Sequence, residues 1–237
     1  MNTAGGGDNP GGDPTQLVVT NGLAAYYQFN DTYDDTMGTY DGFGINNPTF
    51  ASGISGQAVK FSKTNNSSVS IPYGLINSNS FSVSFWATNL SDGLLFYSKC
   101  SDNNDRFSLS IINGSLSFKA SKYNNYHQFE NQNYIFSHPG ISDGKWHHIA
   151  ITANYGSVKQ YSWTTTLYID GKKVGVVTEN LGSVLSESET TNTFVIGGTG
   201  NFGTRVNACD YTCDNFRVYD TRELTAAQVK EIFDAKQ

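Results

Sequence analysis

The sequence predicts an all-β fold, an antiparallel two-sheet sandwich with a short C-terminal helix. Three observations support this prediction: short segments that alternate apolar and polar residues recur at close intervals, two dipeptides between such segments favour hairpin turns, and a segment with helical spacing stands near the end. The chain of 237 residues shows no internal linker after residue 16, and it is long enough for one large sandwich.

The clearest strand covers residues 80–88. Phe81, Val83 and Phe85 face one way there, and the serines between them face the other. A strand with this alternation buries one face and leaves the other more polar, so we expect these three side chains in the core of the sandwich.

Two dipeptides favour tight hairpins, because Asn-Gly and Asp-Gly tolerate the left-handed conformations that a two-residue turn requires. They are Asn113-Gly114, between residues 107–111 and 116–120, and Asp170-Gly171, between residues 165–170 and 173–177. Further strands are expected at residues 23–29, 58–61, 69–71, 146–152, 194–196 and 216–219.

A helix is expected at the C-terminal end. Thr225 followed by Gln228 matches a capping box, in which each of the two residues satisfies a backbone N–H of the other. Val229, Ile232 and Phe233 then recur at helical spacing, so one face of the helix should pack on the sandwich.

Composition excludes some classes of function. Charged residues make up 15% of the chain, against about 25% in average proteins. The net charge is −6 and no cluster of Lys and Arg is visible, which argues against nucleic acid as a partner. There is no apolar run long enough to span a membrane. Residues 1–16, rich in Gly, Asp and Pro, predict a flexible tether or a plain disordered terminus before a domain at 17–237.

The three cysteines, Cys100, Cys209 and Cys213, cannot form a closed disulfide framework because their number is odd. On one strand, Cys209 and Cys213 would lie about 13 Å apart, too far to bridge. A disulfide would therefore need Cys100 and one of the other two. Free buried thiols are the alternative, which we favour.

Six segments resemble, in order, motifs of the laminin-G-like jelly-roll domains in the concanavalin A-like lectin/glucanase superfamily, and most of all its bacterial exported branch. The segments are GLAAYYQFN (22–30), GISGQAVKF (53–61), FSVSFW (81–86), DGKWHHIA (143–150), LYIDG (167–171) and CDNFRVY (213–219), the last followed by residues 224–232. The resemblance runs from about residue 17 to residue 233 and implies an antiparallel two-sheet jelly-roll sandwich. It leaves the ligand open, because fold does not determine function.

Glucanases of this superfamily are expected to carry Glu-x-Asp-x-Glu on one strand, which places the carboxylates on one face. No such motif occurs here. Glu187 and Glu189 are the nearest approach, and they stand in a polar, loop-like stretch. His147 and His148, adjacent on a strand, should point to opposite faces, which argues against a shared metal site and favours a packed core role for His148. We therefore expect no enzyme.

The resemblance implies one cofactor, a structural Ca²⁺ between the loop after the first strand and the Asp near the closing strand. Carried over by position, its ligands would be Asn30, Asp35 and Asp214. Asn30 and Asn215 stand where relatives usually carry acidic residues, which lowers the local charge. The alternative is a polar turn held by Asx hydrogen bonds. Residues 102–105 are a second, weaker candidate loop for the ion.

Candidate ligand-binding residues combine aromatic rings with amide and basic groups, a mixture that suits the apolar faces and hydroxyls of sugars. They stand in two polar segments, 122–134 and 201–205. The residues are Tyr123, Asn125, Tyr126, His127, Phe202 and Arg205. Ordinary strand and loop content is the alternative, because the chain has 14 tyrosines.

Together these features predict a non-catalytic, glycan-binding domain of an exported protein, with an extracellular, periplasmic or cell-surface location. The main alternative is a protein-interaction or adhesion module with a structural role in a surface assembly. A degenerate glycosidase is a third hypothesis, which the missing carboxylate motif disfavours.

Overall fold

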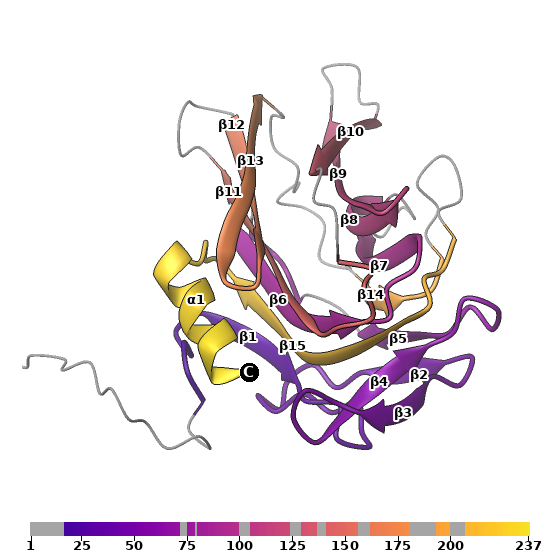
Figure 1. The fold of residues 1–237 in the computed structure, drawn as a ribbon. Coiled ribbons are helices and arrows are strands. Elements are labelled where there is room, and N and C mark those ends of the chain that lie inside the picture. The colour runs from indigo at the N-terminus through magenta and orange to yellow at the C-terminus, as the bar shows by residue number, and fades with distance from the viewer. Residues whose placement is uncertain are drawn as a thin grey trace, which may run out of the picture.

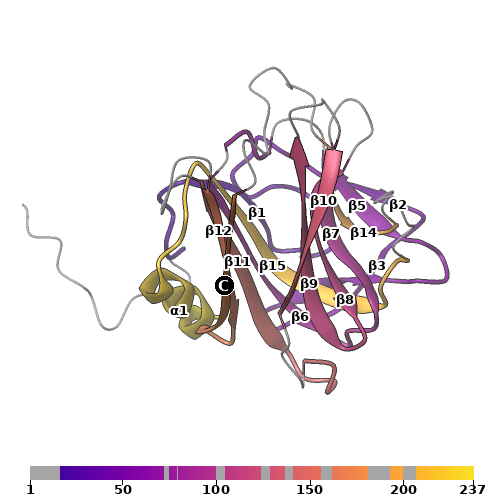
Figure 2. The same cartoon turned by 90° about the horizontal axis from the view of Figure 1, so that it is seen from above.

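The computed structural model describes residues 17–71, 75–78, 80–99, 105–123, 129–136, 141–155, 162–180, 193–199 and 207–237. The expected tether at residues 1–16 lies outside them. These segments form two antiparallel sheets and one C-terminal helix, α1 (Ala226–Ala235), as Figures 1 and 2 show. The predicted jelly-roll sandwich is confirmed.

The first sheet has eight strands, of which β15 is central because it pairs with β1, β4 and β6. In order across the sheet they are β13 (Lys172–Asn180), β12 (Ser162–Ile169), β11 (His147–Tyr155), β6 (Phe81–Thr88), β15 (Tyr211–Asp220), β4 (Gln57–Phe61) and β3 (Thr49–Ser52), with β1 (Leu23–Tyr27) on β15.

The second sheet has seven strands, and neighbours in sequence lie side by side only along one half of it. In order they are β10 (Phe129–Phe136), β9 (Ser115–Tyr123), β8 (Asp105–Ile112), β7 (Gly93–Lys99), β14 (Thr193–Gly197), β5 (Ser68–Ile71) and β2 (Phe43–Ile45).

The two sheets pack face to face around one large apolar core. Phe81, Val83 and Phe85 are buried in it, as their alternation predicts. The ring of Phe81 stacks on Phe107 of the second sheet, with 4.6 Å between the ring centroids, and meets the edge of Trp163 at 6.0 Å. The contact with Phe107 joins the two layers directly, whereas Trp163 belongs to β12 of the same sheet as Phe81.

Helix α1 covers the outer face of the first sheet, the face turned away from the second (Figure 2). The predicted capping box is formed, because Thr225 and its partner three residues later bond each other's backbone N–H. Val229 and Ile232 are fully buried in a second apolar cluster, together with Tyr26 and Tyr219 of the sheet. The helix therefore covers the part of this face that lies over β1, β11, β12 and β15, while Val174 and Val176 of β13 stay exposed.

Trp86 and His148 lie between the first sheet and the helix, next to this second apolar cluster. Trp86 stacks on Phe233 of the helix, with centroids 5.5 Å apart, and packs on the His148 ring at 5.4 Å. The Nε2 atom of His148 lies 2.7 Å from Ser84 Oγ. Burial lowers the pKa of His148 to about 3, so this histidine is neutral at pH 7. It is a core residue, as predicted.

Both predicted hairpins form, with left-handed φ angles at Asn113, Gly114, Asp170 and Gly171. Four strands of the described residues were not among those expected: β2, β3, β7 and β10. In β7 the register with β8 shifts next to Leu94. The shift breaks the alternation of apolar and polar residues, so the sequence pattern does not indicate a strand there.

The closing strand β15 begins at Tyr211, earlier than the pattern indicates. Asn215 has a φ of 51°, and the pairing with β6 shifts between Asp214 and Arg217. Such a bulge reverses the alternation in mid-strand, so the two halves do not read as one strand.

Cys209 and Cys213 are free and buried, as the favoured alternative predicts. Burial raises the pKa of the Cys209 thiol to about 11, and its sulfur lies 2.8 Å from the carbonyl oxygen of Ser91. A thiol with this pKa is unreactive at neutral pH. Cys100 lies outside the described residues.

Removing the apolar contact of the helix should destabilise the protein. For Ile232→Ala we expect a loss of about 2–5 kcal/mol of unfolding free energy, because the fully buried side chain leaves a cavity. The exposed neighbour variant Glu231→Ala should change stability by less than about 0.5 kcal/mol. Urea unfolding measures both, and equal midpoints for the two variants would show that the helix is not docked.

His147 should make stability depend on pH. Its Nδ1 atom lies 2.9 Å from Asp170 Oδ2 and its Nε2 atom 3.1 Å from Asp143 Oδ1. Burial lowers the pKa of His147, but these two carboxylates outweigh it, so the pKa in the folded state is raised. The stabilisation is then complete below the unfolded-state pKa of about 6.5 and is lost as pH rises through the folded-state value.

The difference in melting temperature between wild type and His147→Gln measures this contribution. We expect it to be largest near about pH 5 and to shrink by about pH 8. Buried His148 titrates in the opposite sense in both proteins and cancels in the difference. A difference that grows with pH would contradict the assignment.

Candidate binding site

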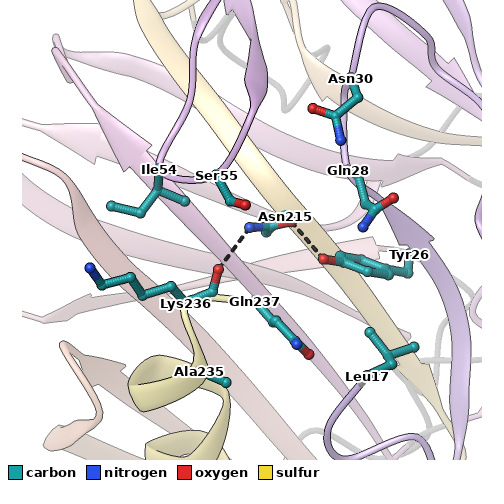
Figure 3. A pocket seen from close by; sticks show the side chains of 10 residues that line it. All are labelled: Leu17, Tyr26, Gln28, Asn30, Ile54, Ser55, Asn215, Ala235, Lys236 and Gln237. Atoms are coloured by element: carbon teal, nitrogen blue, oxygen red, sulfur yellow. Dashed lines mark hydrogen bonds between the residues drawn. The ribbon is translucent and has the colours of Figure 1, made fainter. Parts of the chain in front are cut away.

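A polar pocket of about 440 Å³ lies where the first strand, the 53–57 turn and the end of the helix meet (Figure 3). It is lined by Leu17, Tyr26, Gln28, Asn30, Ile54, Ser55, Asn215, Ala235, Lys236 and Gln237. We call it the terminal pocket.

Hydrogen bonds within the protein use many polar groups of the terminal pocket. Tyr26 donates its hydroxyl to Asn215 Oδ1 at 2.6 Å, and Asn215 Nδ2 donates to the carbonyl of Lys236 at 2.9 Å (Figure 3). Gln237 Oε1 accepts from Arg217 at 2.8 Å, and the Arg217 guanidinium lies 4.5 Å from the centroid of the Tyr26 ring. These contacts join β1, β15 and the helix, which is a structural task.

Two of the predicted metal ligands hold the turn beside this pocket. Asn30 Oδ1 accepts from the backbone N–H of Gln57 at 2.8 Å. Asp214 Oδ2 accepts from the N–H groups of Ile54 and Ser55 at 2.9 and 3.2 Å.

The glycines of this turn give the two side chains room. A Cβ atom on Gly53 would collide with Asp214 Oδ2, and one on Gly56 would collide with Asn30 Oδ1. The Gly-x-x-Gly spacing therefore has a physical cause: both ends of the turn are approached closely by a polar side chain.

Asp35 has a separate role. Its Oδ1 atom accepts from the backbone N–H of Tyr26 at 2.8 Å and of Met37 at 2.9 Å. Its Oδ2 atom accepts from the N–H groups of Thr39 and Tyr40, both at 3.1 Å. Four backbone bonds make this carboxylate the centre of a turn, the alternative considered from the sequence.

These donors do not fit a Ca²⁺ ion, which takes about 6–8 oxygen ligands. Of the three predicted ligands, only Asp214 keeps a buried oxygen without a hydrogen-bond partner, its Oδ1. Burial raises the pKa of Asp214 to about 7. In the part of the chain that the structure describes, no three His, Cys, Asp or Glu side chains gather into a metal-binding group.

A second pocket, of about 380 Å³, lies on the outer face of the second sheet, across β2, β5, β14 and β7. We call it the face groove. It is lined by Ile45, Asn66, Ser68, Ser70, Tyr97, Thr193, Val195, Gly198 and Thr199.

Alternation along the strands produces this groove. In β5, Val69 and Ile71 are buried in the core, so Ser68 and Ser70 point to the outer face. Val195 of β14 stands in register between Ser70 and Tyr97 of β7. At the bottom of the groove an aromatic and an aliphatic side chain, Tyr97 and Val195, lie beside the serines, and both are largely buried.

Asn66 stands out among the polar groups of the groove. Its Oδ1 atom is closed to solvent and has no hydrogen-bond partner among the described residues. None of the nine lining residues is charged. The face groove is therefore lined by residues with neutral hydroxyl and amide side chains beside apolar ones.

The described part of the chain does not test the predicted ligand-binding residues. Tyr123 ends β9, opposite Phe129 in β10, and its side chain is outside the described part. The remaining predicted residues also lie outside it: Asn125, Tyr126, His127, Phe202 and Arg205. So do Glu187 and Glu189 and the loop residues 102–104. That site stays a prediction, whereas sequence reasoning missed the face groove.

A laminin-G family model, described as the concanavalin A-like lectin/glucanases superfamily, matches residues 63–230, more than half of the chain. A comparison with curated protein sequences finds no match.

Among solved structures, domain 4 of AbnA, a GH43 extracellular arabinanase from Geobacillus stearothermophilus in complex with arabinotriose, is 21% identical with a TM-score of 0.67, over 91% of this chain and 98% of that one. The binding domain of Paraclostridial Mosquitocidal Protein 1 is 19% identical with a TM-score of 0.67, over 92% of this chain and 53% of that one. The binding domain of Botulinum Neurotoxin DC in complex with SialylT is also 19% identical, with a TM-score of 0.66, over 92% and 52%.

The chain therefore spans about half the length of the toxin domains and almost all of the arabinanase domain. At these identities, the solved structures support the fold alone. The family match shows that the chain belongs to the concanavalin A-like lectin/glucanases superfamily.

Proposed function

We propose that this chain is a non-catalytic carbohydrate-binding domain of an exported or surface-displayed protein, and that the face groove is its glycan site. The observation that supports this most is the composition of the groove. An apolar floor of Tyr97 and Val195 adjoins serine, threonine and asparagine side chains, without a charged group among them.

Sugars need both parts of such a surface. Their C–H faces pack on aromatic and aliphatic side chains, and their hydroxyls need donors and acceptors at fixed positions. The groove volume of about 380 Å³ lies within the range of small-ligand pockets, about 300–1,000 Å³. The terminal pocket is the weaker candidate, because hydrogen bonds inside the protein occupy much of its polar wall.

The arabinanase domain supports a binding role more strongly than the toxin domains do. The arabinanase domain, described with arabinotriose, corresponds to this chain over nearly its whole length. The toxin domains correspond over about half of theirs, so what they bind could belong to the other half. A site for a neutral sugar is therefore better supported than a site for a sialylated one.

A binding role without catalysis also fits the groove chemistry. Glycoside hydrolysis needs two carboxyl groups on either side of the bond. None of the residues that line the face groove is acidic.

For location, the support is the likeness to a domain of an extracellular enzyme and to toxin binding domains. None of the helices in the described residues is long and apolar enough to cross a membrane. We propose that the domain acts outside the cell or at its surface.

A protein-interaction module is the second candidate. The edge strand β2 exposes Phe43 by 50% and Ile45 by 37%, beside the groove. An exposed apolar edge can pair with a strand of another protein. Capture of one protein partner that added sugars do not displace would favour this alternative.

Glycan binding can be tested by blocking the groove at its exposed rim. We expect the wild type to bind at least one member of an array of plant, host and microbial glycans that includes arabinotriose. Thr199→Trp, which fills the rim, should weaken that binding at least about tenfold, or about 1.4 kcal/mol. Thr178→Trp, on the exposed edge strand β13, is the matched control and should bind as the wild type does. Silence across the array, or full binding by Thr199→Trp, would overturn the proposal.

Calcium is not part of the proposal, and this too can be measured. After chelation, addition of Ca²⁺ up to about 1 mM should produce no binding heat and no rise in melting temperature. A rise that disappears in both Asn30→Ser and Asp214→Asn would restore the ion that the family resemblance implies.

A further inference from the structure

We propose that Phe43 is the stacking platform of the face groove: one ring of a neutral oligosaccharide lies on it while the next rings enter the groove. This inference rests on the proposed function and names a further binding residue of the same site. It starts from exposure. Phe43 is 50% exposed, whereas Tyr97 and Val195 at the bottom of the groove are only 7% and 6% exposed. A ligand can therefore cover far more of Phe43 than of the other two.

The register of the sheet places Phe43 on the face that carries the groove. Phe43 stands in β2, at the edge of the second sheet (Figure 2), directly opposite Ser70, which lines the groove. Directly opposite residues of an antiparallel pair share one face, with their Cβ atoms about 4.5–5.5 Å apart. The next residue, Gly44, faces inward, because a Cβ atom there would lie 2.8 Å from the ring of Tyr33, which packs on the core. Alternation then turns Phe43 outward.

A row of side chains runs from Phe43 across the groove. Ser70 stands opposite Val195 of β14, and Val195 stands opposite Tyr97 of β7. Neighbouring strands lie about 4.8 Å apart, so the row extends about 14 Å from β2 to β7. That length exceeds one sugar ring. An oligosaccharide lying across the strands would contact the exposed ring at one end and the groove at the other.

Hydrogen bonds fix strand β2 on both sides of Phe43. Before it, the backbone N–H of Gly42 donates to the carbonyl of Tyr33 at 2.9 Å. After it, Asn46 Nδ2 donates to the carbonyl of Asn66 at 3.1 Å. The strand that carries the ring is therefore in place before a ligand arrives, and binding loses little free energy to ordering the backbone.

The surroundings of Phe43 select the class of ligand. The face of an aromatic ring is partly negative and packs on the C–H groups of a sugar. Ser70 and the other groove residues add hydroxyl and amide groups, without a charged side chain among them. A partner strand is less well supported as the occupant, because β2 has three residues and offers few backbone groups for pairing. A neutral oligosaccharide fits the row better than a peptide does.

Two substitutions of Phe43 test the ring. Leucine stays apolar but has no aromatic face, so Phe43→Leu should bind arabinotriose, or the best neutral oligosaccharide of the array, about tenfold more weakly in titration calorimetry. Phe43→Trp keeps an aromatic face and should bind at least as tightly as the wild type. Val176→Leu is the matched control, because Val176 is 47% exposed on β13 of the other sheet, and it should bind as the wild type does. All three melting temperatures should stay close to the wild-type value, since both positions are exposed.

The length of the sugar gives a second measurement. For the wild type, affinity should rise from the monosaccharide to the trisaccharide, because only the longer ligand reaches both the groove and Phe43. In Phe43→Leu this gain should be about tenfold smaller, since the missing contact is the one that the longer sugar adds.

Fluorescence reports the contact independently of any loss of affinity. Added trisaccharide should shift the emission of Phe43→Trp to shorter wavelength and protect it from iodide, because the sugar covers the indole. Val176→Trp, equally exposed on the other sheet, should show neither change.

The outcomes separate the two claims. If sugars bind the wild type and Phe43→Leu binds them equally well, or if the emission of Phe43→Trp does not respond, the role of Phe43 is overturned while the carbohydrate-binding function stands. If no glycan binds at all, both fall.

Discussion

The alternation of apolar and polar side chains gives each sheet two chemically different faces, and the whole sandwich depends on how these faces are covered. Both inner faces meet in one aromatic core. Helix α1 covers part of the outer face of the first sheet, where Val229 and Ile232 meet Tyr26 and Tyr219. The face groove lies on the outer face of the second sheet.

The two pockets differ in what their hydrogen bonds already do. In the terminal pocket, Asn215, Tyr26 and Gln237 bond to one another or to the backbone, and these bonds connect the first strand to the closing strand and the helix. A ligand there would have to replace bonds that stabilise the fold. The face groove lies on the other sheet, away from these bonds. Volume alone would have favoured the terminal pocket, and the state of the polar groups reverses that order.

Much of the fold follows from the sequence because its causes are local. The serines between Phe81, Val83 and Phe85 define a face, and Asn113-Gly114 defines a turn. The groove has no local cause. Ser70 and Tyr97 lie on one surface only because β14 inserts between β5 and β7, and no pattern within any of these strands reports that pairing. The metal prediction has a related limit. Position in a motif identified Asp214 as a possible oxygen ligand. Its bonds to the backbone N–H groups of Ile54 and Ser55 could not be predicted, because that turn is distant in the sequence.

Three asparagines of this chain differ in what their side chains do for the fold. Asn30 uses its side-chain oxygen to hold the N–H of Gln57, and Asn215 uses both ends of its amide. Each bond offsets the cost of ordering a polar side chain. Asn66 has a left-handed backbone like Asn215, yet its buried side-chain oxygen has no partner among the described residues. The part that Asn66 plays in its turn is therefore carried by its backbone, which donates to Lys63 and accepts from Asn46.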